Sequence, residues 1–559
     1  MSGFFRASAF FAATILLTFG MIVTKGHSSR TWFFLWLAML FVASVLITVA
    51  VWPRLPRTIP ATQRTIAHGA TLFMVGFLVL GVQLARVQVA DSAIISERTH
   101  SDAGNVDVQD PRHRLMASEV QRGSIFTSDG KVVAQTDKNP DGSFIRSYPD
   151  PATAYLAGYY SPLLYGSSNL EAAYDSELMG ESGGNPITQW LDGILHRDRR
   201  GYDLTLSVNQ DVQDQANQLL GNQRGAAIVM NAKTGAIVAM ASTPNFDPNK
   251  LYVNEGPQIN AETDTAKAYW EQLTSQQDSP LLLRPTQGLY IPGSIFKTVT
   301  ASAALQSGVA QPDTVYRDEG ALTVGSRVIP EENRPDNNRI DYTLTDAYGW
   351  SLNVVFAQIG LQIGPQRMQE FAQKFGFGSD IPFELPVAIS ELDADPSFLS
   401  DQASLAVTAF GQGQIQATPL QMALIADAVA NGGTMMEPYL VQKISDEKGT
   451  TLSTNSPSSW QRAIDEKTAS QMQQIMINSV QNGYASGAQI PGYVVGGKTG
   501  TAEVGGDKQP NSWFIGFAGK TDPEYVVAVV VENGGEGTKV ALPIAHQLLQ
   551  TALQLDETK

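Results

Sequence analysis

The sequence predicts an α/β protein of the α+β kind, with N-terminal membrane helices, a small β-rich domain, and a larger domain in which helices flank an antiparallel sheet. Three observations predict this class. The first 90 of the 559 residues hold three long apolar stretches and no acidic residue. Short β-prone runs around turn residues follow them. The rest of the chain mixes helical patterns with apolar strand-like runs, over a length sufficient for two or three domains.

The membrane region is expected to span residues 1–90, with helices at about 7–24, 32–52 and 67–84. Each stretch is near the length that crosses a bilayer core. The first could be a signal peptide, but no small-x-small cleavage site follows it, so three retained helices are expected. Lys and Arg give a weak positive-inside signal that puts the N-terminus in the cytoplasm and the chain after the third helix outside it. The inside would carry Arg6, Arg54, Arg57 and Arg64, and the outside Lys25, Arg30 and Arg86.

Composition excludes several kinds of site. The chain has no cysteine, and its six histidines lack the spacing of metal ligands, so no disulfide, metal or cofactor is expected. All 54 acidic residues follow the membrane region, which argues against a nucleic-acid partner because such proteins need a basic surface.

The soluble part is expected to hold a linker at 91–110 and two domains, at 111–200 and 201–559. Residues 119–136, EVQRGSIFTSDGKVVAQT, are two β-prone runs around a Ser-Asp-Gly turn. Near Gly201 a strand is followed by an amphipathic helix, and we place the domain boundary there. The chain closes with two strand-like runs and a helical pattern, VALPIAHQLLQTALQL.

The tripeptide Lys-Thr-Gly occurs twice, at 233–235 and at 498–500. The first copy lies between two apolar runs, where Gly235 suits a hairpin turn and Lys233 is expected in solvent. The second lies in YVVGGKTGTAEV, a strand whose middle is nearly bare of side chains. Glycine inside a strand usually marks the close approach of a ligand or another backbone. The second copy is therefore the candidate for chemistry.

A serine nucleophile would need a base other than histidine, because His546 is the only histidine after Gly201 and lies in the terminal helical pattern. Lysine can serve if its pKa is lowered. Ser294 and Lys297 are three residues apart at the start of an apolar helical pattern, so both are expected on one helix face. An N-capping serine with a solvated lysine is the alternative. Ser-x-x-Lys also occurs at Ser128 and Ser445, but in polar turns.

A third element, Ser351 and Asn353, precedes another apolar helical pattern, where a helix cap is again the alternative. Each pattern alone is weak. Their order is more specific: Ser-x-x-Lys opening a helix, then Ser-x-Asn, then Lys-Thr-Gly on a late Gly-rich strand, which is the set found in penicillin-binding proteins and serine β-lactamases.

From about Val120 to the end, the chain resembles class B penicillin-binding proteins. The resemblance rests on RGSIFTSDGKVVAQT, AAIVMNAKTGAIVAMASTPNFDPN, YIPGSIFK, FGQGQIQATPLQMALIADAVANGG, GGKTGTAE and WFIGFAG, in family order. It implies a penicillin-binding, β-lactamase-like transpeptidase domain at 201–559 and a non-catalytic pedestal domain at 111–200.

The resemblance also implies roles for individual residues. Ser294 would attack the carbonyl of a D-Ala-D-Ala stem peptide, and Lys297 would accept its proton. Ser351 would relay a proton to the leaving amine, and Lys498 would place positive charge near the substrate carboxylate. The backbone N–H groups of Ser294 and Thr501 would form the oxyanion hole. The catalytic candidates are thus Ser294, Lys297, Ser351 and Lys498, and the substrate-binding candidates are Asn353, Thr499, Gly500 and Thr501.

The implied activity is peptidoglycan D,D-transpeptidation at a bacterial cell membrane, in cell-shape or division synthesis, with stem peptides and β-lactams as ligands. The departure from the family is three membrane helices instead of one, and we expect them to dock a polytopic partner of the SEDS glycosyltransferase type. A D,D-carboxypeptidase and a membrane-bound β-lactam sensor stay open as alternatives. A class A β-lactamase is disfavoured because Glu-x-x-Leu-Asn is missing between Asn353 and Lys498.

Overall fold

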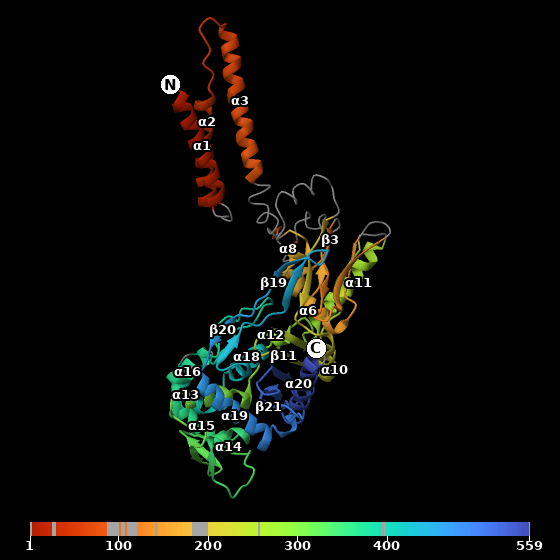
Figure 1. The fold of residues 1–559 in the computed structure, drawn as a ribbon, viewed down its shortest axis with the longest axis vertical. Helices are drawn as coiled ribbons and strands as arrows, with labels where there is room; N and C mark the ends of the chain where they lie inside the picture. Colours follow the sequence, from red (N-terminus) through yellow and green to blue (C-terminus); the bar gives the residue numbers. More distant parts are fainter. Residues whose placement is uncertain are drawn as a thin grey trace. The chain divides into compact units, whose positions relative to one another are not determined.

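A computed structural model describes residues 3–24, 30–86, 100–101, 107–108, 120–139, 144–181, 199–254, 258–393, 395 and 397–557 (Figure 1). Contacts divide the chain into two units, Met1–Met116 and Ala117–Lys559. Most of the expected linker at 91–110 lies outside the described residues. The two short segments described there, β1 (His100–Ser101) and β2 (Asp107–Val108), pair antiparallel.

The first unit contains three helices long and apolar enough to cross a membrane. Large apolar side chains such as Phe73 and Leu80 are exposed on them, while Ala13 and Ala43 are fully buried between helices. The expected stretches are confirmed as helices, and the third begins earlier than expected because a polar first turn precedes its apolar part. The helices are α1 (Gly3–Thr24), α2 (Arg30–Val51) and α3 (Ala61–Ala85).

A five-stranded antiparallel sheet forms the centre of the second unit, in the order β12-β11-β23-β22-β21. The expected hairpin around the first Lys-Thr-Gly is its β11–β12 pair, and the Gly-rich strand is its edge strand β21. An edge strand leaves one row of backbone groups unpaired by the sheet. The strands are β11 (Gly225–Asn231), β12 (Ile237–Thr243), β21 (Val494–Ala502), β22 (Asn511–Gly519) and β23 (Tyr525–Val531).

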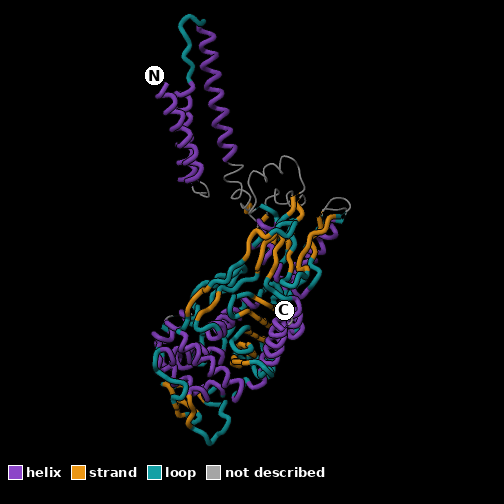
Figure 2. Tube along the Cα trace, viewed as in Figure 1, coloured by secondary structure: helices purple, strands orange, loops and turns teal. Residues whose placement is uncertain are grey.

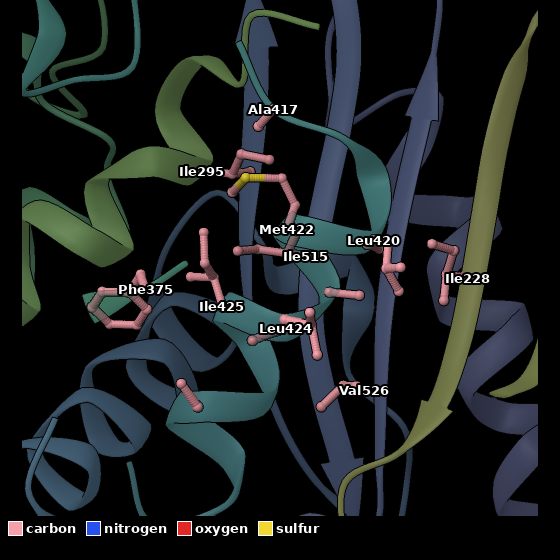
Figure 3. Packing of buried hydrophobic residues seen from close by; sticks show 14 of the residues in the cluster. Ile228, Ile295, Phe375, Ala417, Leu420, Met422, Leu424, Ile425, Ile515 and Val526 are labelled. Atoms are coloured by element: carbon pink, nitrogen blue, oxygen red, sulfur yellow. The ribbon is translucent and has the colours of Figure 1, made fainter. Parts of the chain in front are cut away.

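Helices cover both faces of this sheet, so its strands are buried on both sides and read as continuous apolar runs (Figure 2). On one face lies α18 (Pro419–Ala430), buried along its whole length, with Leu420 and Met422 packed near Ile515 of β22 (Figure 3). The other face packs against α10 (Gln210–Leu220) and α20 (Ala541–Glu557), which confirms the expected terminal helix.

A second sheet has six strands in the order β19-β18-β10-β4-β5-β6. The expected Ser-Asp-Gly hairpin is confirmed as its antiparallel β4–β5 pair. Two strands come from far along the chain and extend this sheet beyond the residues at 111–200. Its members are β4 (Ile125–Phe126), β5 (Val132–Lys138), β6 (Phe144–Ser147), β10 (Asp203–Leu206), β18 (Val441–Ser445) and β19 (Thr451–Thr454).

Buried charges hold the elements beside this sheet together. Glu171 accepts hydrogen bonds from Nε of Arg122 at 2.6 Å and from Nε of Arg146 at 2.7 Å, and Tyr148 donates its hydroxyl to the same carboxylate. These arginines lower the pKa of Glu171 against the opposing effect of its burial. The neighbouring elements are β3 (Val120–Gln121), α6 (Pro151–Ala157), β7 (Tyr160–Ser161), β8 (Gly166–Ser167), α7 (Asn169–Ala173), α8 (Asp175–Leu178) and β9 (Arg199–Arg200).

The remaining elements complete the second unit. They comprise, in chain order, η2 (Pro248–Leu251), α11 (Ile259–Ser275), α12 (Arg284–Gln287), η3 (Gly293–Phe296), α13 (Lys297–Gln306), β13 (Val315–Arg317), β14 (Ala321–Val324), β15 (Arg327–Pro330), β16 (Asp341–Thr343), α14 (Leu344–Gly349), α15 (Asn353–Ile363), α16 (Pro365–Lys374), η4 (Phe398–Ser400), α17 (Gln402–Thr408), β17 (Thr434–Met436), β20 (Ser459–Arg462), α19 (Glu466–Asn482) and η5 (Ser486–Ala488).

Candidate active site

One cavity of about 600 Å³ in the second unit collects the candidate residues that face solvent. It is lined by Ser294, Ser351, Asn353, Thr499 and Thr501, which come from three separate parts of the sequence. The two candidate lysines, Lys297 and Lys498, are fully buried. The structure therefore brings all three patterns together.

Ser294 lies on a single 3₁₀ turn, η3, that runs directly into α13. The helix was expected to begin at Ser294, but its regular α-helical part begins at Lys297. Gly293 has φ +59° and donates its N–H to the Gly411 carbonyl at 2.8 Å. This hydrogen bond holds the turn against the Gly411 backbone. A side chain at Gly411 would collide with the Gly293 carbonyl, so this contact requires glycine. Ser294 makes no capping hydrogen bond, and the N-cap alternative is wrong.

Lys297 connects the turn that carries Ser294 to the Ser-x-Asn segment. Its Nζ is 3.1 Å from Oγ of Ser294, 3.2 Å from Oγ of Ser351, 2.6 Å from the Ser351 carbonyl and 2.8 Å from Oδ1 of Asn353. A neutral amine can donate two N–H groups to the two closest oxygens and direct its lone pair to a serine hydroxyl. The geometry suits a base shared between the two serines.

Burial lowers the pKa of Lys297 from its ordinary value to about 7, although the negative charge of Glu331 opposes the shift. Desolvation disfavours the charged form of an amine. A lysine whose pKa lies near neutrality is a competent general base at neutral pH.

Ser351 is held in a left-handed backbone conformation, with φ +60°. Such a conformation is costly for a residue other than glycine and persists only where the surroundings impose it. Here the Ser351 N–H donates to the Tyr348 carbonyl at 3.1 Å, and the Ser351 carbonyl accepts from Lys297 and from Nδ2 of Asn333. Leu352, not Ser351, occupies the N-cap of α15, so the cap alternative is wrong here too.

Lys498 lies on β21, with its Nζ 3.0 Å from the Thr499 carbonyl and 5.6 Å from the centre of the Tyr348 ring. Burial, and then the charge of Lys297, hold its pKa well below the ordinary value. A charged Lys297 therefore disfavours the protonation of Lys498. Tyr348 is fixed in turn by a 2.8 Å hydrogen bond between its hydroxyl and Oγ1 of Thr298.

The glycines of β21 are explained by what occupies the space above them. A Cβ on Gly497 would meet the Phe514 ring at 2.4 Å. A Cβ on Gly500 would lie 3.0 Å from Ile295 and 3.2 Å from the Pro292 carbonyl, both beside the nucleophile turn. The close approach predicted from the glycines is confirmed, and its partners are aromatic rings and the turn that carries Ser294.

The first Lys-Thr-Gly lies in the turn between β11 and β12, as expected. Gly235 has φ +80°, and Lys233 is exposed, with its Nζ 3.3 Å from Oδ1 of Asn431. Lys233 is not among the described residues that line the cavity.

The sequence patterns missed Glu331 and Asn333, which follow β15. Glu331 accepts hydrogen bonds from the Val354 N–H at 2.8 Å and the Asn333 N–H at 3.0 Å. Neither residue belongs to a short motif, and both lie in the polar run PEENRPDNN, which reads as an ordinary loop. The local sequence carries no signal that could have singled them out.

Comparison with known proteins agrees with the site's three-part construction. Residues 225–550 match the penicillin binding protein transpeptidase domain, and residues 122–204 match the penicillin binding protein A dimerisation domain. The peptidoglycan D,D-transpeptidase PbpA of Mycolicibacterium smegmatis is 33% identical over 494 residues, which cover 85% of this chain and 98% of that protein.

Two solved structures resemble this chain over most of its length. Penicillin-binding protein A of M. tuberculosis, as its penicillin G acyl-enzyme complex, is 30% identical with a TM-score of 0.69, covering 78% of this chain and 99% of that one. The D,D-transpeptidase domain of a peptidoglycan glycosyltransferase from Eggerthella lenta is 33% identical with a TM-score of 0.69, covering 79% of this chain and all of that one.

Proposed function

Because the chain belongs to the class B penicillin-binding proteins, we propose that Ser294 is the nucleophile through which it cross-links peptidoglycan stem peptides. The protein is a serine-type peptidoglycan D,D-transpeptidase, and β-lactams inhibit it covalently. The observation that supports this proposal most strongly is the 3.1 Å contact between Oγ of Ser294 and Nζ of the fully buried Lys297.

In the acylation step, Oγ of Ser294 attacks the carbonyl of the penultimate D-Ala while Lys297 accepts the hydroxyl proton. The backbone N–H groups of Ser294 and Thr501 stabilise the developing oxyanion, as preorganised donors do in acyl transfer. Lys498 supplies positive charge near the terminal carboxylate, which Thr499 and Thr501 hydrogen-bond.

The proton must then reach the leaving group. Oγ of Ser351 is 3.2 Å from Nζ of Lys297, so it can pass this proton to the D-Ala amine as the C–N bond breaks. Asn353, whose Oδ1 accepts from Lys297, holds the substrate amide with the rest of its side chain. The amine of a second stem peptide next attacks the acyl-enzyme, returns one proton through the same path, and releases Ser294 with a new peptide bond.

The test is covalent labelling of full-length protein in detergent with fluorescent penicillin, read by gel and intact mass. Ser294→Ala should abolish labelling with an unchanged melting temperature. Ser128→Ala, which removes an exposed hydroxyl that donates one hydrogen bond to the Val208 carbonyl, should label normally. Labelling that persists in the Ser294 variant would place the nucleophile elsewhere.

We propose further that the soluble unit is extracytoplasmic and that the three helices dock a polytopic SEDS-type glycosyltransferase. The support is the unequal distribution of arginine around the helices and the large apolar surface that α1, α2 and α3 expose. Cross-linking should capture this partner with the full chain. A variant with the three helices replaced by one unrelated apolar helix should keep penicillin labelling and lose the cross-link.

A further inference from the structure

The loop after β15 contacts the Ser-x-Asn segment. The proposed reaction steps do not use these contacts. Glu331 is half-buried and accepts two backbone N–H groups through its two carboxylate oxygens. The donor at 2.8 Å is the N–H of Val354, the second residue of α15. The first turn of a helix leaves N–H groups without intrahelical partners. Leu352 at the N-cap has no side chain that could accept from them, and Glu331, from another part of the chain, accepts one of them, the N–H of Val354.

The neighbouring Asn333 extends this support to Ser351. Its own N–H donates to Oε1 of Glu331, and its Nδ2 donates to the Ser351 carbonyl at 3.0 Å. That carbonyl also accepts from Lys297. One carboxylate thus stabilises both ends of the Ser-x-Asn segment, whose serine has the unfavourable φ of +60°.

The charge of Glu331 provides a second connection, to the proposed base Lys297. Lys297 faces Glu331 from the loop after β15, Lys498 from β21, and the rings of Phe356 and Phe410 at 5.4 Å and 6.0 Å. Around Glu331 itself lie the charged Asp318 and the hydroxyl of Tyr484. Among these groups Glu331 is the one whose negative charge acts on Lys297, where it opposes the effect of burial.

We propose that Glu331 is a positioning residue for the transpeptidase reaction, which caps the helix bearing Asn353 and sets the basicity of Lys297 with the same carboxylate. The inference rests on the proposed function, because it assigns Lys297 as the base for Ser294. A helix cap alone would fix geometry only. A charge beside the base also determines the pH at which the base becomes neutral.

The two effects can be separated by substitution. Glu331→Gln keeps the size of the side chain, removes the charge, and leaves one of the two backbone donors without an acceptor. Glu331→Asp keeps the charge and shortens the reach. Glu319→Gln removes a charge from an exposed position, where Glu319 contacts Arg317 on the surface, and serves as the matched control.

The experiment measures the second-order rate constant for penicillin acylation of the full-length protein from pH 5 to pH 9. In Glu331→Gln, loss of the attraction lowers the pKa of Lys297 further, so the midpoint of the acid limb should move down by roughly one pH unit. The plateau rate should also fall, by roughly tenfold, since the base is weaker and the segment is less firmly held. Glu331→Asp should keep the wild-type midpoint with a lowered plateau, and Glu319→Gln should match the wild type in both.

Other outcomes overturn the proposal. An unmoved midpoint with a slower plateau in Glu331→Gln would reduce Glu331 to a structural cap, and an upward shift would contradict the sign. If Glu331→Gln does not fold, Glu331→Asp decides the matter: a wild-type plateau or a displaced midpoint in that variant refutes the assignment. A wild-type protein without Ser294-dependent labelling would defeat the proposed function itself, whereas normal labelling with superimposed profiles defeats only the role of Glu331.

Discussion

At the scale of single residues, two buried lysines contact residues that line one cavity, and the proposed reaction needs them in opposite charge states. Lys297 must be neutral to accept a proton, whereas Lys498 is proposed to meet a carboxylate as a cation. Burial lowers the pKa of both, and the charge of Lys297 lowers that of Lys498 further. A bound substrate carboxylate would favour the protonated form of Lys498, and that cation would then keep Lys297 neutral.

The pH dependence of acylation follows from this arrangement. Lys297 is neutral above its pKa of about 7 and protonated below it. The rate of penicillin acylation should therefore rise with pH and level off above the midpoint. Below it, the rate should fall by about tenfold per pH unit, because only the neutral amine accepts the Ser294 proton. Stopped-flow or quenched labelling between pH 5 and pH 9 measures the profile, with melting temperatures across the range as the control. A flat profile would exclude Lys297 as the base.

The two Lys-Thr-Gly lysines make a matched pair of substitutions. Lys498→Ala removes a buried cation next to the proposed carboxylate site and should slow penicillin acylation by roughly tenfold to a hundredfold or more, corresponding to about 1.5–3 kcal/mol or more. Lys233→Ala removes an exposed side chain and should change stability and rate by less than about 0.5 kcal/mol. Second-order rate constants and melting temperatures for both variants check this. Equal rates, or a larger loss at Lys233, would refute the assignment.

The chemical groups of the candidate site could be predicted from the sequence, whereas some of the residues that hold these groups in position could not. Ser294, Lys297 and Lys498 stand out because their types, spacing and surroundings fit one kind of acyl transfer. Glu331 does not stand out, because its contact with Val354 joins positions 23 residues apart and depends on how a polar loop folds over a helix end. Ser351 was found by motif, but its positive φ follows from tertiary contacts that no local pattern encodes.

At the scale of elements, the Gly-rich strand β21 is an edge strand placed against the nucleophile turn. Gly500 pairs with Trp513 of β22, and the Trp513 Nε1–H donates to the Ile291 carbonyl at 3.0 Å. The strand, its neighbour and the turn before Ser294 are thus connected within a few residues. A displacement of β21 would move both Thr501 and the turn that presents Ser294.

Gly500→Ala tests this coupling. The added Cβ would lie 3.0 Å from Ile295 and from Trp513, so either the strand or the turn must shift. Overpacking of this kind costs about 1–3 kcal/mol. We expect penicillin acylation to be slower by roughly tenfold or more. The melting temperature should fall by a smaller proportion.

The control for that substitution is Gly487→Ala. Its Cβ would meet only the end of the Leu542 side chain, which can move aside. Acylation by this variant should stay close to that of the wild type. If Gly500→Ala acylates as fast as Gly487→Ala, the strand is not coupled to the turn.

Local elements were predictable where the pattern was local, as in the β4–β5 and β11–β12 hairpins and the helix α20. Their assembly was not. The six-stranded sheet pairs Leu204 of β10 with Ile444 of β18, two positions 240 residues apart. The sequence of neither strand indicates which strand it pairs with. The fully buried α18 likewise shows little periodicity, because every face of that helix packs against protein.

At the scale of the whole molecule, the open question is topology, and a reporter test addresses it directly. The three helices α1, α2 and α3 are each long and apolar enough to span a membrane. Three spans place the N-terminus and the unit Ala117–Lys559 on opposite sides. Four arginines, Arg6, Arg54, Arg57 and Arg64, would lie on the side of the N-terminus and three basic residues on the other side, which weakly favours a cytoplasmic N-terminus. Alkaline phosphatase, which requires an extracytoplasmic environment, should be active when fused after Asn105 and inactive when fused after Arg57. A green fluorescent protein fused at the same two positions should show the reverse pattern. Phosphatase activity at both positions would mean that α3 does not cross the membrane, and activity only after Arg57 would invert the topology and put Ser294 on the cytoplasmic side.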